Sequence, residues 1–96
     1  MIVRIVKMSF RAEELDNFKQ IFLTTKDKIR NFEGCKYVEL LNDIQKPTIF
    51  FTYSHWESEE HLEKYRHSEL FKTTWAKTKI LFAEKAETWS VQNIIT

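Results

Sequence analysis

The sequence contains very little glycine, proline or cysteine, each of which occurs once in 96 residues, as Gly34, Pro47 and Cys35. With 43% hydrophobic residues beside so few flexible positions, the chain is not of the disordered, collagen-like or linker-rich classes. One glycine also excludes the glycine-rich loops that bind phosphates and dinucleotides. One cysteine forms no intramolecular disulfide and no zinc cage, which favours a reducing location, so we expect a cytoplasmic protein.

An excess of one charge is also missing, because 15 lysines and arginines face 14 acidic residues and leave a net charge of +1. A nucleic-acid partner is therefore not expected, since the phosphate backbone rewards a basic excess. The apolar start, residues 1–10, is too short and too charged for a signal peptide or a membrane span, so no membrane partner is expected. The three histidines do not cluster at metal-ligand spacings, and no metal site is predicted.

Hydrophobic periodicity predicts alternating strands and helices within one domain, residues 1–96. The strands are expected over residues 2–10, 37–41, 48–56 and 86–94, and the helices over about 12–31, 58 to about 66, and 68 to about 82. Ser58 and Ser68 are candidate N-caps of the two shorter helices. Gly34 supplies the permissive backbone with which the chain leaves the long helix.

This order is βαββαβ, the ferredoxin-like α+β arrangement, in which the helices cover one face of a four-stranded antiparallel sheet. The first strand is apolar on both faces: Val3 and Ile5 lie on one face, and Ile2, Val6, Met8 and Phe10 lie on the other. The uncovered face would be a larger hydrophobic patch than monomers normally expose. We therefore expect a homodimer in which two sheets pack face to face about a twofold axis.

Three segments stand in a distinctive order and spacing: FEGCKYVEL (residues 32–40), FFTYSHWES (50–58) and HSELF (67–71). They resemble the antibiotic biosynthesis monooxygenase family of dimeric α/β-barrel proteins, and the resemblance covers nearly the whole chain. Some members of this family oxygenate anthrones or quinols with O₂ and without metal or flavin, some cleave haem, and some isomerise small sugar-derived molecules. The resemblance thus implies the fold and a choice among activities.

The first hypothesis is an enzyme, a cofactor-independent monooxygenase that oxidises a small aromatic, quinol or anthrone-like substrate with O₂. Such a site needs an apolar pocket and polar groups that hold and ionise a phenolic oxygen. His67 is the candidate base, because imidazole titrates near neutral pH, and Tyr65 is the second catalytic candidate. The candidate substrate-binding residues are Tyr53, His55, Trp56 and Trp75.

Each candidate also has a structural interpretation: His67 as a solvated residue, His55 as a dimer-face or edge residue, and both tryptophans as core. The sequence leaves open which face His55 and Trp56 occupy. Tyr65 and Leu70 stand where many family members carry histidine, so the main alternative is a non-catalytic ligand-binding or stress-related dimer. An isomerase fits less well, and haem degradation is disfavoured because Trp75 stands where that branch has its iron-ligating histidine.

Overall fold

The chain alternates strands and helices in the predicted order, and the computed structural model describes all of residues 1–96. The strands are β1 (Ile2–Phe10), β2 (Cys35–Asn42), β3 (Ile49–Trp56) and β4 (Phe82–Val91). The helices are α1 (Leu15–Arg30), which follows the 3₁₀ turn η1 (Ala12–Glu14), α2 (Glu59–Arg66) and α3 (Glu69–Lys79). The strands form one antiparallel sheet in the order β2-β3-β1-β4, which confirms the ferredoxin-like fold.

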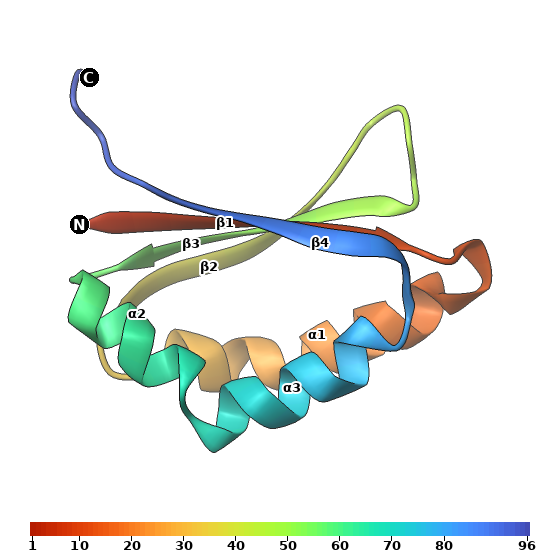
Figure 1. Ribbon diagram of the computed structural model, residues 1–96, viewed down its shortest axis with the longest axis horizontal. Coiled ribbons are helices and arrows are strands. Elements are labelled where there is room, and N and C mark those ends of the chain that lie inside the picture. Colours follow the sequence, from red (N-terminus) through yellow and green to blue (C-terminus); the bar gives the residue numbers. More distant parts are fainter.

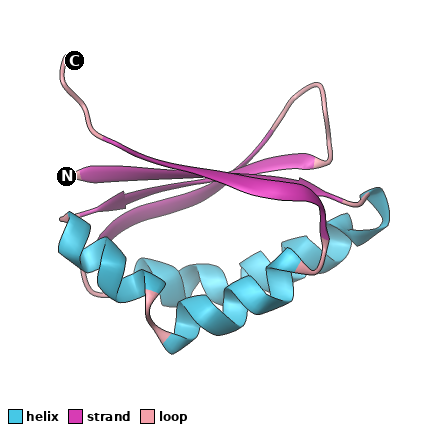
Figure 2. Ribbon diagram, in the orientation of Figure 1, coloured by secondary structure: helices cyan, strands magenta, loops and turns pink.

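The molecule has two layers, because all three helices lie on the same side of the sheet (Figure 1). Figure 2 shows that no helix covers the opposite side, which we call the open face. None of the helices is long and apolar enough to cross a membrane. The side chains between the two layers therefore have to form both the core and any internal site.

Serine caps begin the two shorter helices, as the sequence predicts. The Ser58 hydroxyl accepts a hydrogen bond from the backbone N–H of His61, and the Ser68 hydroxyl accepts one from that of Phe71. The chain bends between the two caps, at His67. This bend turns one helical stretch into two helices: α2 packs against β3, and α3 packs against α1.

The end of the last helix differs from the prediction. Helix α3 stops at Lys79, and Phe82 is the first residue of β4 rather than the last of a helix. Phe82 pairs with Phe10 across the sheet, and their rings lie 5.3 Å apart, centroid to centroid. A core-facing aromatic fits the stripe of a helix and the inner face of a strand equally well, so its spacing alone does not separate the two structures.

The core consists of two buried clusters between the sheet and the helices. The first cluster is Met8, Phe10, Phe18, Phe50 and Leu81, and the second is Ile29, Val38, Trp56 and Leu62. Only 11 of the 96 residues are buried, because a single sheet with helices on one side encloses little volume. Members of both clusters also face the cavity described below, which lies between them.

The open face carries mostly apolar and aromatic side chains, with Lys7, Glu39 and Glu87 among them. Strand register places these residues on it: Val3, Ile5, Tyr37, Leu41, Phe51, Tyr53, His55, Trp89 and Val91. Tyr37, Leu41, Trp89 and Val91 are 39–44% exposed, although all of them are large and apolar. Side chains of this kind lie on a surface in such numbers mainly where another molecule covers them.

Candidate functional site

A cavity of about 290 Å³ lies between the sheet and the three helices. Of its 20 lining residues 12 are hydrophobic, so most of a bound molecule would touch apolar surface. Ligand sites usually measure about 300–1,000 Å³, and this one is just below the lower limit of that range. It therefore fits a single small molecule.

Aromatic rings form a connected series along one side of the cavity. Trp56 from β3 stacks on Tyr65 from α2 at 4.8 Å between ring centroids and an interplanar angle of 27°. Tyr65 in turn meets Phe71 edge-on at 5.3 Å, and Phe71 stacks on Trp75 at 5.8 Å. The series presents flat, apolar and polarizable surfaces, against which a planar ring packs well.

Tyr65 reaches the cavity because it shares one side of α2 with Leu62 and Arg66, at spacings of three and four residues. Its surroundings are apolar, and burial raises the pKa of its hydroxyl, with a smaller contribution from Cys35. The phenol stays neutral throughout the ordinary pH range. Tyr65 can therefore donate a hydrogen bond inside the cavity and does not serve there as a base.

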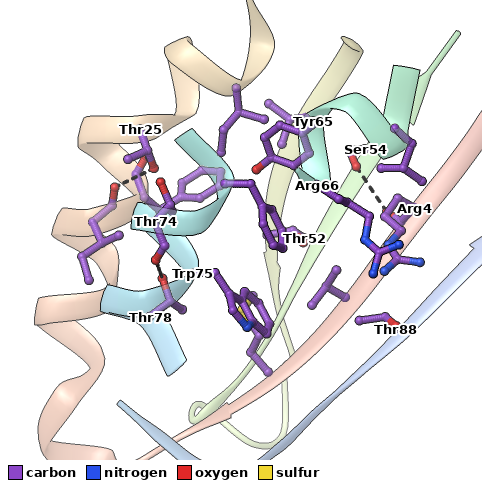
Figure 3. Close-up of a pocket in the computed structure, with 18 of the residues that line it drawn as sticks. Arg4, Thr25, Thr52, Ser54, Tyr65, Arg66, Thr74, Trp75, Thr78 and Thr88 are labelled. Carbon is purple, nitrogen blue, oxygen red and sulfur yellow. Dashed lines mark hydrogen bonds between the residues drawn. The ribbon is translucent and has the colours of Figure 1, made fainter. Parts of the chain in front are cut away.

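Hydroxyl groups are scattered over the otherwise apolar wall (Figure 3). Thr25 and Thr78 donate hydrogen bonds to the helix carbonyls of Ile21 and Thr74, at 2.8 and 2.7 Å. Ser54 accepts a 3.0 Å hydrogen bond from the indole N–H of Trp56. The remaining hydroxyls of the wall belong to Thr52, Thr74 and Thr88. These groups can orient a polar substituent without making the cavity hydrophilic.

Two arginines, Arg4 from β1 and Arg66 from α2, stand together on one side of the cavity, near Ser54 and Thr88 (Figure 3). Arg4 Nη1 donates to the hydroxyl of Ser90 at 2.9 Å. Burial, and then the neighbouring charge of Arg66, lower the pKa of Arg4, although its guanidinium stays charged in water at any ordinary pH. The wall contains no carboxylate, so this side of the cavity is positively charged.

The structure brings three of the six predicted site residues together at the cavity: Trp56, Tyr65 and Trp75. His67 lies elsewhere, at the bend between α2 and α3, where its side chain is 76% exposed. Its Nε2 atom is 3.3 Å from a carboxylate oxygen of Glu63. The candidate base of the sequence hypothesis thus stands outside the cavity wall.

Tyr53 and His55, the other two predicted substrate-binding residues, lie on the open face, on the side of the sheet opposite the cavity. Their rings are 5.0 Å apart, and Tyr37 contacts His55 from β2 at 5.6 Å. The Nε2 atom of His55 is buried without a hydrogen-bond partner. The sequence did not decide which side of the sheet Trp56 and His55 occupy. In the structure, Trp56 points toward the helices and His55 points away from them.

Sequence reasoning missed the two arginines and the hydroxyls of the wall. Arg4 did leave a signal, because it occupies an inward position of an apolar strand, between Ile2 and Val6, where an unpaired cation is rare. Arg66 lies four residues after Leu62, on the side of α2 that faces the cavity, and its side chain is 43% exposed. No three histidine, cysteine, aspartate or glutamate side chains are grouped closely enough to hold a metal ion.

Comparisons with known proteins place this fold in a family. The family described as antibiotic biosynthesis monooxygenase matches residues 1–77 of the chain. The chain belongs to this family. The matched region of this antibiotic biosynthesis monooxygenase family member includes every residue of the cavity wall except Thr78 and Thr88. The resemblance carried by the three sequence segments is thereby confirmed.

Solved structures share the architecture over almost the full length of the chain. A crystal structure of an antibiotic biosynthesis monooxygenase has a TM-score of 0.92 at 16% identity, and the alignment covers 99% of this chain and 100% of that one. A conserved protein from Methanosarcina mazei Go1 has a TM-score of 0.91 at 18% identity, with 98% and 94% covered. Rv0793 from Mycobacterium tuberculosis has a TM-score of 0.90 at 13% identity, with 99% and 96% covered. Such low identities show a common fold alone, and no match was found among curated proteins.

Proposed function

We propose that this family member is a monooxygenase that oxidises a small aromatic, quinol or anthrone-like molecule with O₂ and without a bound cofactor. The observation that supports this most is the small aromatic-lined cavity with the neutral hydroxyl of Tyr65 in its wall. The family match to residues 1–77 points to the same class of reaction. The cavity, rather than the open face, is the proposed site of the chemistry.

The reaction balances when the substrate itself is the reductant. An anthrone-type ring loses a proton and becomes an electron-rich anion, which can transfer electrons to O₂. Two C–H bonds of one ring carbon are replaced by a C=O bond. One oxygen atom becomes that carbonyl oxygen, and the other leaves as water with the two hydrogens. Four electrons pass from the carbon to O₂, so no further reductant is needed.

The residues of the cavity have matching roles in this proposal. Trp56 and Trp75 hold the ring of the substrate, and the neutral hydroxyl of Tyr65 donates a hydrogen bond to the oxygen that becomes negative. No carboxylate or imidazole belongs to the wall, so the substrate proton passes to water. The pH dependence of the rate should therefore follow the ionisation of the substrate and not that of a histidine.

The experiment is O₂ uptake by the pure protein with a panel of quinols and anthrones, compared with heat-inactivated protein. We expect Tyr65→Phe, which keeps the ring and removes only the hydroxyl, to lower kcat by about a hundredfold. His67→Asn is the matched control, and its rate should equal that of the unmodified protein. Substrate binding without O₂ uptake would contradict the proposal and favour the non-catalytic ligand-binding dimer.

We also propose that two copies pair through their open faces. The single chain exposes 6546 Å², whereas a folded monomer of 11.7 kDa exposes roughly 5,900 Å². The excess is consistent with a subunit that has an apolar face to cover. Tyr37, Leu41, Trp89 and Val91, all on this face, are the apolar side chains that such pairing would cover.

A reducing, cytoplasmic location completes the proposal. The only thiol of the chain, on Cys35, is free, and burial raises its pKa, so it is held as an unreactive thiol. Fractionation of cells that produce the protein, followed by detection with an antibody, tests the location. Recovery from an oxidising compartment would contradict it.

A further inference from the structure

The two arginines of the cavity wall differ in how they are neutralised. Arg4 donates a hydrogen bond to Ser90, which has a neutral hydroxyl, and it takes part in none of the ion pairs of the chain. An arginine carries five N–H donors, so Arg4 keeps most of them available. A half-buried guanidinium with no anionic partner is costly unless something else supplies the negative charge.

Arg66 does have a carboxylate partner, but that partner is shared. Arg66 Nη1 lies 2.6 Å from one oxygen of Glu63, and His67 Nε2 lies 3.3 Å from the other. Glu63 is outside the cavity wall and about half exposed. The pair of guanidinium groups therefore faces one carboxylate, which leaves about one positive charge uncompensated at this side of the cavity.

From this geometry we propose that the natural ligand of the cavity carries one carboxylate group, which Arg4 and Arg66 bind together. The inference rests on the proposed function in that it takes the cavity as the substrate site. Guanidinium groups bind carboxylates through paired N–H donors. A single negative charge matches the single uncompensated positive charge, which favours a carboxylate over a doubly charged phosphate.

The rest of the cavity indicates what is attached to that carboxylate. The aromatic series begins beside the arginines, at Tyr65, and continues through Phe71 to Trp75. Trp75 lies farther from the arginines, so a planar ring would extend from the charged side toward Trp75 (Figure 3). At about 290 Å³, the space suits one small planar molecule. The proposed substrate is thus a small quinol- or anthrone-like aromatic molecule that carries one carboxylate group.

The test measures binding alone, with two probes of similar shape that are not quinols. Isothermal titration of the full chain with 2-naphthoate and with 2-naphthalenemethanol compares a carboxylate with a neutral alcohol. We expect the carboxylate to bind at least about tenfold more tightly at low salt, because charge-assisted hydrogen bonds are the stronger ones. High salt should weaken the naphthoate and leave the alcohol unchanged.

Variants assign this preference to the two arginines. Arg4→Gln and Arg66→Gln should each reduce it to about threefold or less without weakening the alcohol. Glu63→Gln should increase the affinity for naphthoate, because it removes the carboxylate that competes for Arg66. Lys72→Gln is the matched control: it removes one positive charge from α3 outside the cavity wall and should leave the preference intact.

The outcomes separate this inference from the proposed function. If the unmodified protein binds naphthoate no better than the alcohol, or if its preference does not respond to salt, the inference is overturned, even where quinols are oxidised. The salt comparison needs no variant, so a variant that fails to fold does not decide the result. If the carboxylate preference is present and depends on both arginines, the inference stands even without O₂ uptake.

Discussion

The two faces of the sheet carry similar apolar side chains in different surroundings. On the helix side, Trp56 is 1% exposed and packs against residues of the same chain. On the open face, Trp89 is 44% exposed and has no layer above it. The first face encloses a cavity with two charged groups in its wall, whereas no other element of the chain covers the second. Hydrophobic composition alone does not distinguish the two faces. The connectivity of the chain does, because it places all three helices on one side of the sheet.

The largest expected effect comes from removing the ring on the helix side. Trp56→Ala should lower the free energy of unfolding by about 3–5 kcal/mol, because it deletes a fully buried aromatic side chain. Urea unfolding at a fixed protein concentration measures the change. The comparison between faces fails if Trp89→Ala, made under the same conditions, costs as much at concentrations too low for pairing.

An intermediate effect is expected on the open face. Trp89→Lys should raise the dissociation constant of the proposed dimer by roughly 30-fold or more, because a charge would have to be buried between two apolar sheets. Sedimentation velocity over a range of concentrations measures it. Ile44→Lys is the matched control: this apolar residue is 99% exposed in the loop between β2 and β3 and lies outside the open face. An unmodified protein that stays monomeric would refute the proposed pairing.

The smallest effect concerns the carboxylate beside the cavity. Hydrogen bonding from Arg66 is the main cause that lowers the pKa of Glu63 in the folded chain. A lowered folded pKa stabilises the chain above the ordinary glutamate value of about 4.3, and this contribution disappears as the pH falls through the folded pKa. Glu63→Gln should therefore remove a small part of the acid sensitivity of Tm. Glu60→Gln, which alters no ion pair, should not change that sensitivity.

The fold could be predicted because its signals are local. Alternation in β1, the apolar stripe of α1 and the serine caps of α2 and α3 each lie within a few neighbouring residues. The exception at Phe82 has the same origin. Helix and strand both place that ring on the core side, and local spacing does not distinguish them.

The site could be predicted only in part, because it depends on contacts between distant segments. Aromatic residues in the predicted elements and the family resemblance identified Trp56, Tyr65 and Trp75, but the meeting of Arg4 with Arg66 depends on the packing of α2 against β3, the strand that pairs with β1. His67 is two residues beyond Tyr65. At about 100° per residue, this spacing places His67 on nearly the opposite side of α2 from Tyr65. A shift of one or two positions thus separates the cavity from solvent.

Gly34 has a consequence for the cavity that its position in a turn does not suggest. Its φ angle is +86°, and a Cβ atom there would overlap the imidazole ring of His61 in α2. The same helix brings Tyr65 and Arg66 to the ligand space. The absence of a single methyl group lets α2 settle close to the sheet, and any larger residue would have to push that helix outward. The size of residue 34 therefore limits how closely α2 approaches the sheet, and with it the width of the cavity, although Gly34 is not part of the cavity wall.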